Sequence, residues 1–164
     1  MAAGKKTRRK LGALVMASVV GLGASVSGST AKEQKDPSRF SYVRLHCTPD
    51  NQSHFSNVTI DLAKENFAPP AAPIAIGGNR TTSRAFIAGF GAHWGAADLQ
   101  SRLNHPAPAV QVFAVLRGAF SITVTDGETR RLHAGDMVLL EDITPCRGHI
   151  TVVGDKPGFL LFAR

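Results

Sequence analysis

The polar residues best suited to chemistry in this 164-residue chain fall into two short clusters in its C-terminal half. His105 precedes Gln111 by six residues, and His149 closes a polar loop that follows the apolar run 137–140. Imidazole nitrogens and an amide oxygen can hydrogen-bond a small molecule or ligate a divalent metal ion. If the segments that carry the two clusters converge, the sequence predicts one binding pocket that holds all three side chains.

The segments that must position these residues have the pattern of short β-strands. Polar and apolar residues alternate along 119–125, which predicts a strand with one buried and one solvent-facing side. Asp126-Gly127 is typical of a tight hairpin turn, because glycine tolerates positive φ. The three prolines of 67–73 exclude a central strand there and predict an extended segment on the surface or along a barrel rim. Strands are expected at 40–45, 57–62, 84–90, 111–116, 119–125, 137–140, 149–153 and 159–163.

Many short strands with turn signals between them predict an all-β domain, built as an antiparallel sandwich or barrel. No long segment has helical periodicity, and no internal repeat is visible. The length suits one domain with a short N-terminal extension. A long loop over 91–108 carries Trp94 as well as His105, and Trp94 is interpreted either as a lid over the pocket or as a core aromatic.

The spacing of the two clusters resembles the two-motif core of the cupin superfamily, whose members are small barrels of the jelly-roll or double-stranded β-helix type. The residues at the first motif's two histidines, glutamate and glycine are His105, Ala107, Gln111 and Gly118. The second motif's glycine, aspartate and histidine match Gly135, Asp136 and His149. The resemblance covers roughly residues 42–164, and this part of the chain is similar to small single-domain bacterial cupins. It implies a single cupin-type antiparallel β-barrel.

The resemblance also implies a metal site, which this chain matches only in part. Cupin metal sites commonly use three histidines and one carboxylate, whereas Ala107 and Gln111 stand at one histidine position and at the carboxylate position. The candidate ligands for Fe, Mn, Ni or Zn are His105, Gln111 and His149. Loop residues that can complete the shell are His93, Asp98, Glu141 and Asp142. The candidate substrate contacts are Trp94, Phe113 and Gln111.

Two functions of different class follow from this partial match. In the first, the protein binds a small polar molecule in the barrel and, with a divalent metal, acts on it as an oxygenase or isomerase. In the second, the protein is a metal-free module that binds or senses a small molecule without catalysis. The sequence assigns no catalytic residue, so whether the protein is an enzyme stays open.

The first 31 residues have the layout of an export signal. Five basic residues precede a small-residue apolar run over 11–28, and Ser29-Thr30-Ala31 offers small residues for cleavage. Arg8-Arg9 resembles a twin-arginine signal in part, and the general export route is the alternative. Glycines and serines interrupt the apolar run, which argues against a stable membrane anchor, although a single-pass anchor is the competing interpretation. We expect a periplasmic or secreted protein with a signal peptide over 1–31, a flexible lead-in over 32–39 and the barrel over 40–164.

The charge of the chain gives no sign of a nucleic-acid partner. The formal net charge is +7, but without the five basic residues of the signal the remaining 14 basic and 12 acidic residues leave only +2. No basic stripe with interleaved aromatic residues is present in the mature part. We therefore expect a small-molecule ligand and, since barrel edges often pair, a homodimer as a further candidate partner. Cys47 and Cys146 can form a disulfide in an oxidising compartment or remain separate thiols.

Overall fold

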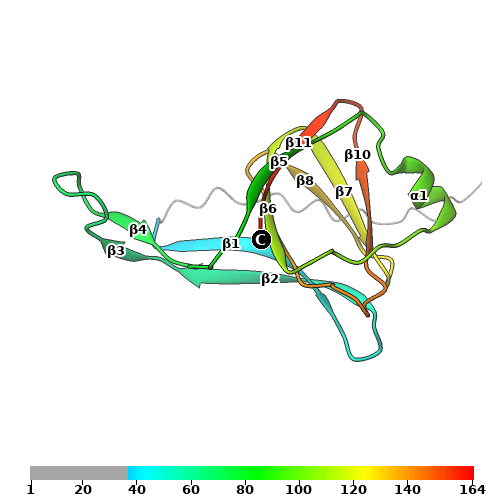
Figure 1. Ribbon diagram of the computed structural model, residues 1–164, viewed down its shortest axis with the longest axis horizontal. Coiled ribbons are helices and arrows are strands. Elements are labelled where there is room, and N and C mark those ends of the chain that lie inside the picture. Colours follow the sequence, from blue (N-terminus) through cyan, green and yellow to red (C-terminus); the bar gives the residue numbers. More distant parts are fainter. Residues whose placement is uncertain (1–36) are drawn as a thin grey trace, which may run out of the picture.

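The computed structural model of the protein describes residues 37–164, which fold into eleven β-strands and one short helix (Figure 1). The expected all-β class is confirmed. The signal peptide expected over 1–31 and most of the lead-in expected over 32–39 lie outside the described residues. The strands are β1 (Arg39–Cys47), β2 (Ser53–Asp61), β3 (Ala63–Glu65), β4 (Ile74–Ile76), β5 (Ala85–Phe90), β6 (Gln111–Arg117), β7 (Ala119–Val124), β8 (Thr129–His133), β9 (Met137–Leu140), β10 (His149–Val153) and β11 (Gly158–Ala163).

The strands are arranged in two larger sheets and one small one. The first has the order β2-β1-β9-β6-β11-β5, the second β10-β7-β8, and β3 pairs only with β4. β1 runs parallel to β9, with Val43 opposite Val138, so the expectation of a purely antiparallel arrangement is wrong at this pair. β1 and β9 lie far apart in the sequence and no hairpin joins them. The chain therefore does not force them to run in opposite directions.

Both larger sheets contribute to one hydrophobic core. The alternation expected over 119–125 is confirmed, because Phe120, Ile122 and Val124 of β7 are each at most 2% exposed. They belong to the same buried cluster as Phe113 of β6 and Leu160 of β11. The expected hairpin turn also forms, since Gly127 adopts φ 92° between β7 and β8. The core thus fixes the inner faces of the strands that carry the candidate site.

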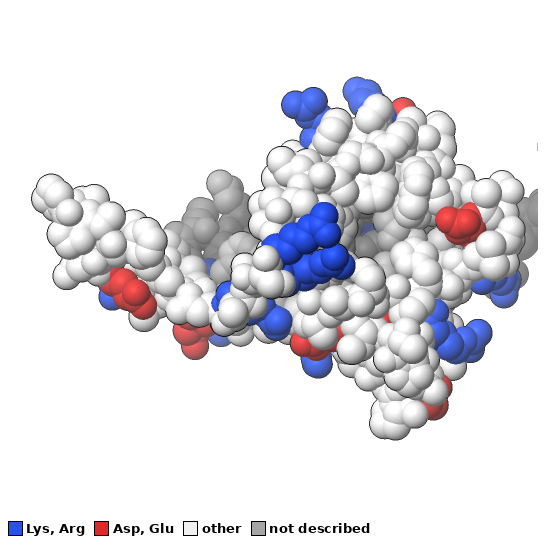
Figure 2. Space-filling model, in the orientation of Figure 1, with Lys and Arg blue, Asp and Glu red and all other residues white. Residues whose placement is uncertain are grey.

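The proline-rich segment forms part of an arm that projects from the body of the molecule. Figure 1 shows β3 and β4 extending away from the remaining strands, with the prolines in the connection between them. All residues from Ala63 to Ile74 are exposed, and the side chain of Phe67 is 72% exposed. In the view of Figure 2 the tip of this arm carries no charged side chain. The expected extended segment is therefore a surface feature away from the two larger sheets.

The long loop before β6 contains α1 (Ala96–Ser101), a helix that the sequence did not reveal. Gly95 begins it with φ 79°, and a Cβ at this position would lie 1.9 Å from the carbonyl oxygen of Thr151. The backbone of this loop therefore lies directly against β10. The amide of Val153 donates to the carbonyl of Trp94 at 2.9 Å, which fixes the tryptophan beside the same strand.

Within residues 37–164, no helix has the length and apolar character needed to cross a membrane. Lys and Arg side chains lie in several separate groups on the face that Figure 2 shows, with Asp and Glu between them. This mixed distribution differs from the continuous basic surface that binds nucleic acid.

Candidate functional site

A cavity of about 100 Å³ opens at one end of the core, where the loop that carries Trp94 meets β6, β10 and β11. It brings together the five residues that the sequence proposed as ligands or substrate contacts, namely Trp94, His105, Gln111, Phe113 and His149. No charged Lys, Arg, Asp or Glu side chain lines it. Its wall is largely apolar, and the polar groups are the two histidines, the glutamine and Thr151. The predicted pocket geometry is therefore present, while its occupant stays a prediction.

His149 is the most buried histidine of the site, at 4% exposure, and begins β10. Its Nδ1 lies 2.6 Å from Oδ2 of Asp142, which is fully buried. In a neutral imidazole that donates to a carboxylate, Nδ1 carries the proton and Nε2 keeps its lone pair. Nε2 makes no hydrogen bond with the described residues. Asp142 thus prepares His149 as an acceptor in the cavity wall.

Four loop residues were candidates to complete the ligand shell, and Asp142 is the one that contacts a candidate ligand, His149. Glu141 instead pairs with Arg44 at 2.5 Å, and His93 lies 3.9 Å from the exposed Asp155. Asp98 lies on α1. Asp142 Oδ1 is buried without a hydrogen-bond partner, the one such side-chain atom within residues 37–164. Within residues 37–164, His149 is therefore the one side chain that bonds this buried carboxyl group.

His105 faces His149 across a two-residue bridge. Each donates its amide to the other's carbonyl, at 2.9 and 3.0 Å, and the ring centroids are 4.8 Å apart. Burial lowers the pKa of His105 from its ordinary value, and the neighbouring His149 lowers it further. The close approach depends on Gly148, whose φ is 82° and whose absent Cβ would lie 2.0 Å from the carbonyl oxygen of His105. Glycine is therefore required at position 148 for the backbones that carry His105 and His149 to lie this close together.

Gln111 begins β6 and is only 6% exposed. Its carboxamide makes no hydrogen bond with any of residues 37–164, and its polar atoms keep some access to solvent. Because the side chain lines the cavity, its N–H donors and its oxygen are available to whatever occupies that space. In the sequence, Gln111 was identified because it stands at the glutamate position of the first motif. The structure adds that its carboxamide has no hydrogen-bond partner within residues 37–164.

Four aromatic rings form much of the cavity wall. Phe90 and Trp94 meet edge to face with centroids 5.0 Å apart, and Phe113 lies 5.6 Å from Phe162. Phe113 is 3% exposed and forms the interior wall, whereas Trp94 is 43% exposed and lies at the mouth. Of the two interpretations of Trp94, the exposed position at the mouth favours the lid.

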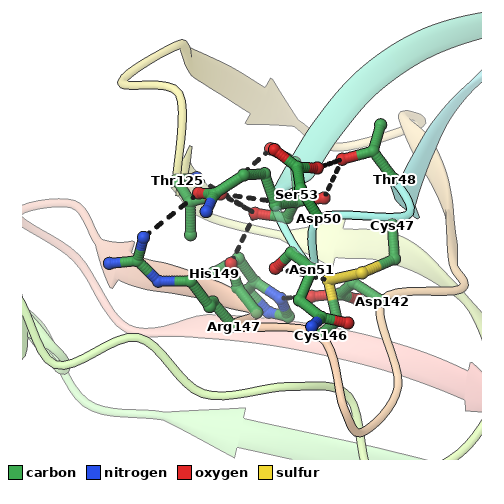
Figure 3. Close-up of a disulfide and its surroundings, with 12 residues drawn as sticks. Cys47, Thr48, Asp50, Asn51, Ser53, Thr125, Asp142, Cys146, Arg147 and His149 are labelled. Atoms are coloured by element: carbon green, nitrogen blue, oxygen red, sulfur yellow. Dashed lines mark hydrogen bonds and ion pairs between the residues drawn. A yellow bond between two sulfur atoms is a disulfide. The ribbon is translucent and has the colours of Figure 1, made fainter.

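A disulfide holds the loop that carries Asp142 and His149 (Figure 3). Cys47 and Cys146 are paired with their Cα atoms 5.8 Å apart, which decides between the two alternatives that the sequence left open. The amide of Arg147 donates to Asn51, and the hydroxyl of Ser53 donates to the carbonyl of Gly148. The loop between β9 and β10 is thereby tied to the turn between β1 and β2. This explains how a polar loop can keep a buried carboxylate in place.

The donor set for a metal is incomplete. Residues 37–164 contain no group of three or more His, Cys, Asp or Glu side chains placed to hold a metal ion. The candidate ligands provide two imidazoles, from His105 and His149, and the neutral amide of Gln111. The nearby carboxylate of Asp142 is engaged with Nδ1 of His149. Hard divalent ions prefer charged oxygen ligands, so this set falls short of three histidines and a carboxylate.

No family model and no curated protein sequence matches this chain. Among solved structures, the crystal structure of protein NMB1881 from Neisseria meningitidis is similar over 52% of this chain and 76% of that chain. The two are 14% identical, with a TM-score of 0.36. A likeness at this level carries no argument about fold or function.

Proposed function

We propose that the protein binds a small molecule with a polar head group in the cavity bounded by His105, Gln111 and His149. The observation that carries this proposal is the carboxamide of Gln111, which lines the cavity, keeps some access to solvent there and makes no hydrogen bond with residues 37–164. Because an amide has both N–H donors and an oxygen acceptor, the site favours a molecule that both donates and accepts hydrogen bonds.

The size and lining of the cavity limit the ligand. A volume of about 100 Å³ is well below the roughly 300–1,000 Å³ of pockets for drug-sized ligands. The aromatic wall suits an apolar body, whereas the polar groups lie together where His105 faces His149. The proposed ligand is therefore small, uncharged and polar at one end.

We propose a cupin-type barrel and an exported protein as the setting of this site. The two motif glycines support the fold, because Gly118 and Gly135 have φ of 87° and 97°, a conformation that favours glycine. The disulfide between Cys47 and Cys146 supports export to the periplasm or beyond, because such bonds persist in oxidising compartments. Association of two copies stays a prediction.

A metal-dependent activity is the second candidate, and one observation favours it. Histidines that ligate metals usually donate their other ring nitrogen to a carboxylate, as His149 does to Asp142. His105, Gln111 and His149 would then hold Fe, Mn, Ni or Zn, which would supply Lewis-acid or oxygen chemistry to an oxygenase or isomerase. The incomplete donor set makes this candidate weaker than metal-free binding.

Ligand-observed NMR on the mature protein with a panel of small polar molecules tests the leading proposal. We expect binding that is weakened at least tenfold in Gln111→Leu, a change that keeps the size of the side chain and removes its amide. Gln100→Leu, on the exposed face of α1, is the matched control. A panel without any binder, or binders that Gln111→Leu does not affect, would contradict the proposal.

Elemental analysis of protein purified without chelator tests the second candidate. Near-stoichiometric Fe, Mn, Ni or Zn that is lost in both His105→Ala and His149→Ala would establish a metal site. Protein that takes up none of these metals after reconstitution would leave the metal-free module.

A further inference from the structure

The orientation of His149 defines what the ligand must offer. Its Nδ1 lies 2.6 Å from Oδ2 of Asp142, so in the neutral ring Nδ1 donates to the carboxylate and Nε2 is the acceptor left for the cavity. The carboxylate is fully buried and has no other side-chain partner, which ties it to this one orientation. A ligand beside His149 should therefore present a hydrogen-bond donor.

The cavity wall defines the rest of the ligand. The rings of Phe90, Phe113 and Phe162 line the interior, and flat aromatic faces pack well against another ring. The absence of lysine and arginine from the lining disfavours a carboxylate or phosphate, which would be desolvated there without a counter-charge. The combination of aromatic walls, an acceptor nitrogen and no charge is selective for a neutral, planar donor.

We infer that the cavity takes a small hydroxylated aromatic molecule of the phenol class, whose hydroxyl donates to Nε2 of His149. This inference rests on the proposed small-molecule function and names the ligand class of the same site. Asp142 is a positioning residue that acts through His149. The carboxamide of Gln111 supplies a donor to the hydroxyl oxygen of the ligand.

The experiment compares two probes, 4-fluorophenol and fluorobenzene, by ¹⁹F NMR titration of the mature protein. Fluorobenzene is smaller and more apolar, so it enters any cavity that selects only for size and apolar character. We expect 4-fluorophenol to bind at least about tenfold more tightly, the size of one well-formed hydrogen bond. In His149→Phe and Asp142→Asn this preference should fall to about twofold or less, while His133→Gln, at an exposed histidine, retains it.

A second measurement does not depend on the variants being folded. The ¹⁵N shifts of His149 in the unchanged protein should report a proton on Nδ1 alone, and a proton on Nε2, in the neutral or in the charged ring, would overturn the inference. Equal affinity for the two probes, or a phenol preference that survives both variants, would also overturn it. If neither probe binds while another panel molecule binds through Gln111, the phenol class is wrong and the proposed function stands. If neither the two probes nor any panel molecule binds, both the phenol class and the proposed function are wrong.

Discussion

Gly148 lies so close to His105 that a Cβ on the glycine would be 2.0 Å from the histidine's carbonyl oxygen. This contact allows the backbones that carry His105 and His149 to pair, so that two imidazoles from distant parts of the sequence share one cavity wall.

Gly148→Ala should lower the free energy of unfolding by about 2 kcal/mol or more, because it adds a backbone clash to the cost of a positive φ. Gly127→Ala is the matched control, since Gly127 has φ 92° and no other atom lies within 4 Å of the position that its Cβ would take. The control should therefore lose only about 1–2 kcal/mol for the conformation. Urea denaturation of the two variants checks the difference, and equal losses would show that the clash is relieved by backbone movement.

Opening the disulfide should destabilise the fold strongly. The bond joins residues 99 positions apart, and a loop of about 100 residues gives a loss near 4.7 kcal/mol by chain entropy, within a usual range of about 2–5 kcal/mol. The test compares urea denaturation of the oxidised protein with that of the Cys47→Ser, Cys146→Ser double variant. The double variant should also bind the site's ligand less well, because the bond holds the loop of Asp142 and His149. A loss under about 1 kcal/mol would mean that the loop is held by its hydrogen bonds instead.

Asp142→Ala should cost about 1–3 kcal/mol, because it leaves Nδ1 of the buried His149 without an acceptor. Asp61→Ala removes the partner of Arg39 from an ion pair whose two side chains are 61% and 88% exposed. Such surface pairs contribute about 0–1 kcal/mol, so the control should be close to neutral. Thermal unfolding followed by circular dichroism distinguishes the two. Equal losses of stability in the two variants would show that Asp142 stabilises the fold no more than an exposed aspartate does.

Stability should fall as the pH is lowered through the range just below 6.5, the ordinary pKa of histidine. Burial lowers the pKa of both His46 and His105, with Arg44 and His149 as the next causes respectively. The unfolded chain then binds more protons than the native state, so the stabilisation is present above pH 6.5 and is lost as the pH falls toward the native pKa values. The His46→Gln, His105→Gln double variant should show a shallower slope in denaturation between about pH 8 and pH 5. A slope as steep as that of the parent would locate the effect in other groups.

Residues 1–40 fused to a reporter should carry it across the cytoplasmic membrane. Replacing Arg8-Arg9 with lysines should stop transport if the twin-arginine route is used, because that route requires the arginine pair. Fractionation of the reporter measures the outcome. Transport that survives the change would leave the general export route, and a reporter that stays in the cytoplasm would contradict export altogether.

The sequence predicted the features that depend on local patterns. Alternation identified β7, the Asp-Gly pair identified its hairpin turn, and the spacing of His105, Gln111 and His149 identified residues that share a cavity. It missed β8, where adjacent arginines at positions 130 and 131 obscure the single buried Leu132. Local patterns cannot show such a strand when only one of its side chains enters the core.

The sequence could not predict features that depend on long-range pairing. The parallel contact between β1 and β9 joins strands that are distant in the described chain, and no turn encodes their relative direction. The role of Asp142 was equally hidden, because four loop residues were equivalent candidates until the disulfide and the turn between β1 and β2 fixed the loop. The direction in which a loop side chain points is a tertiary property.

The projecting arm offers a practical attachment point. Its tip is exposed throughout, and Figure 1 shows β3 and β4 at the opposite end of the molecule from α1, which lies near the cavity mouth. A peptide tag or a fluorophore inserted between Ala71 and Ala72 would thus be displayed away from the ligand site, since exposed loop tips tolerate insertion. The protein could be immobilised on a sensor surface by this arm with its cavity facing the solution.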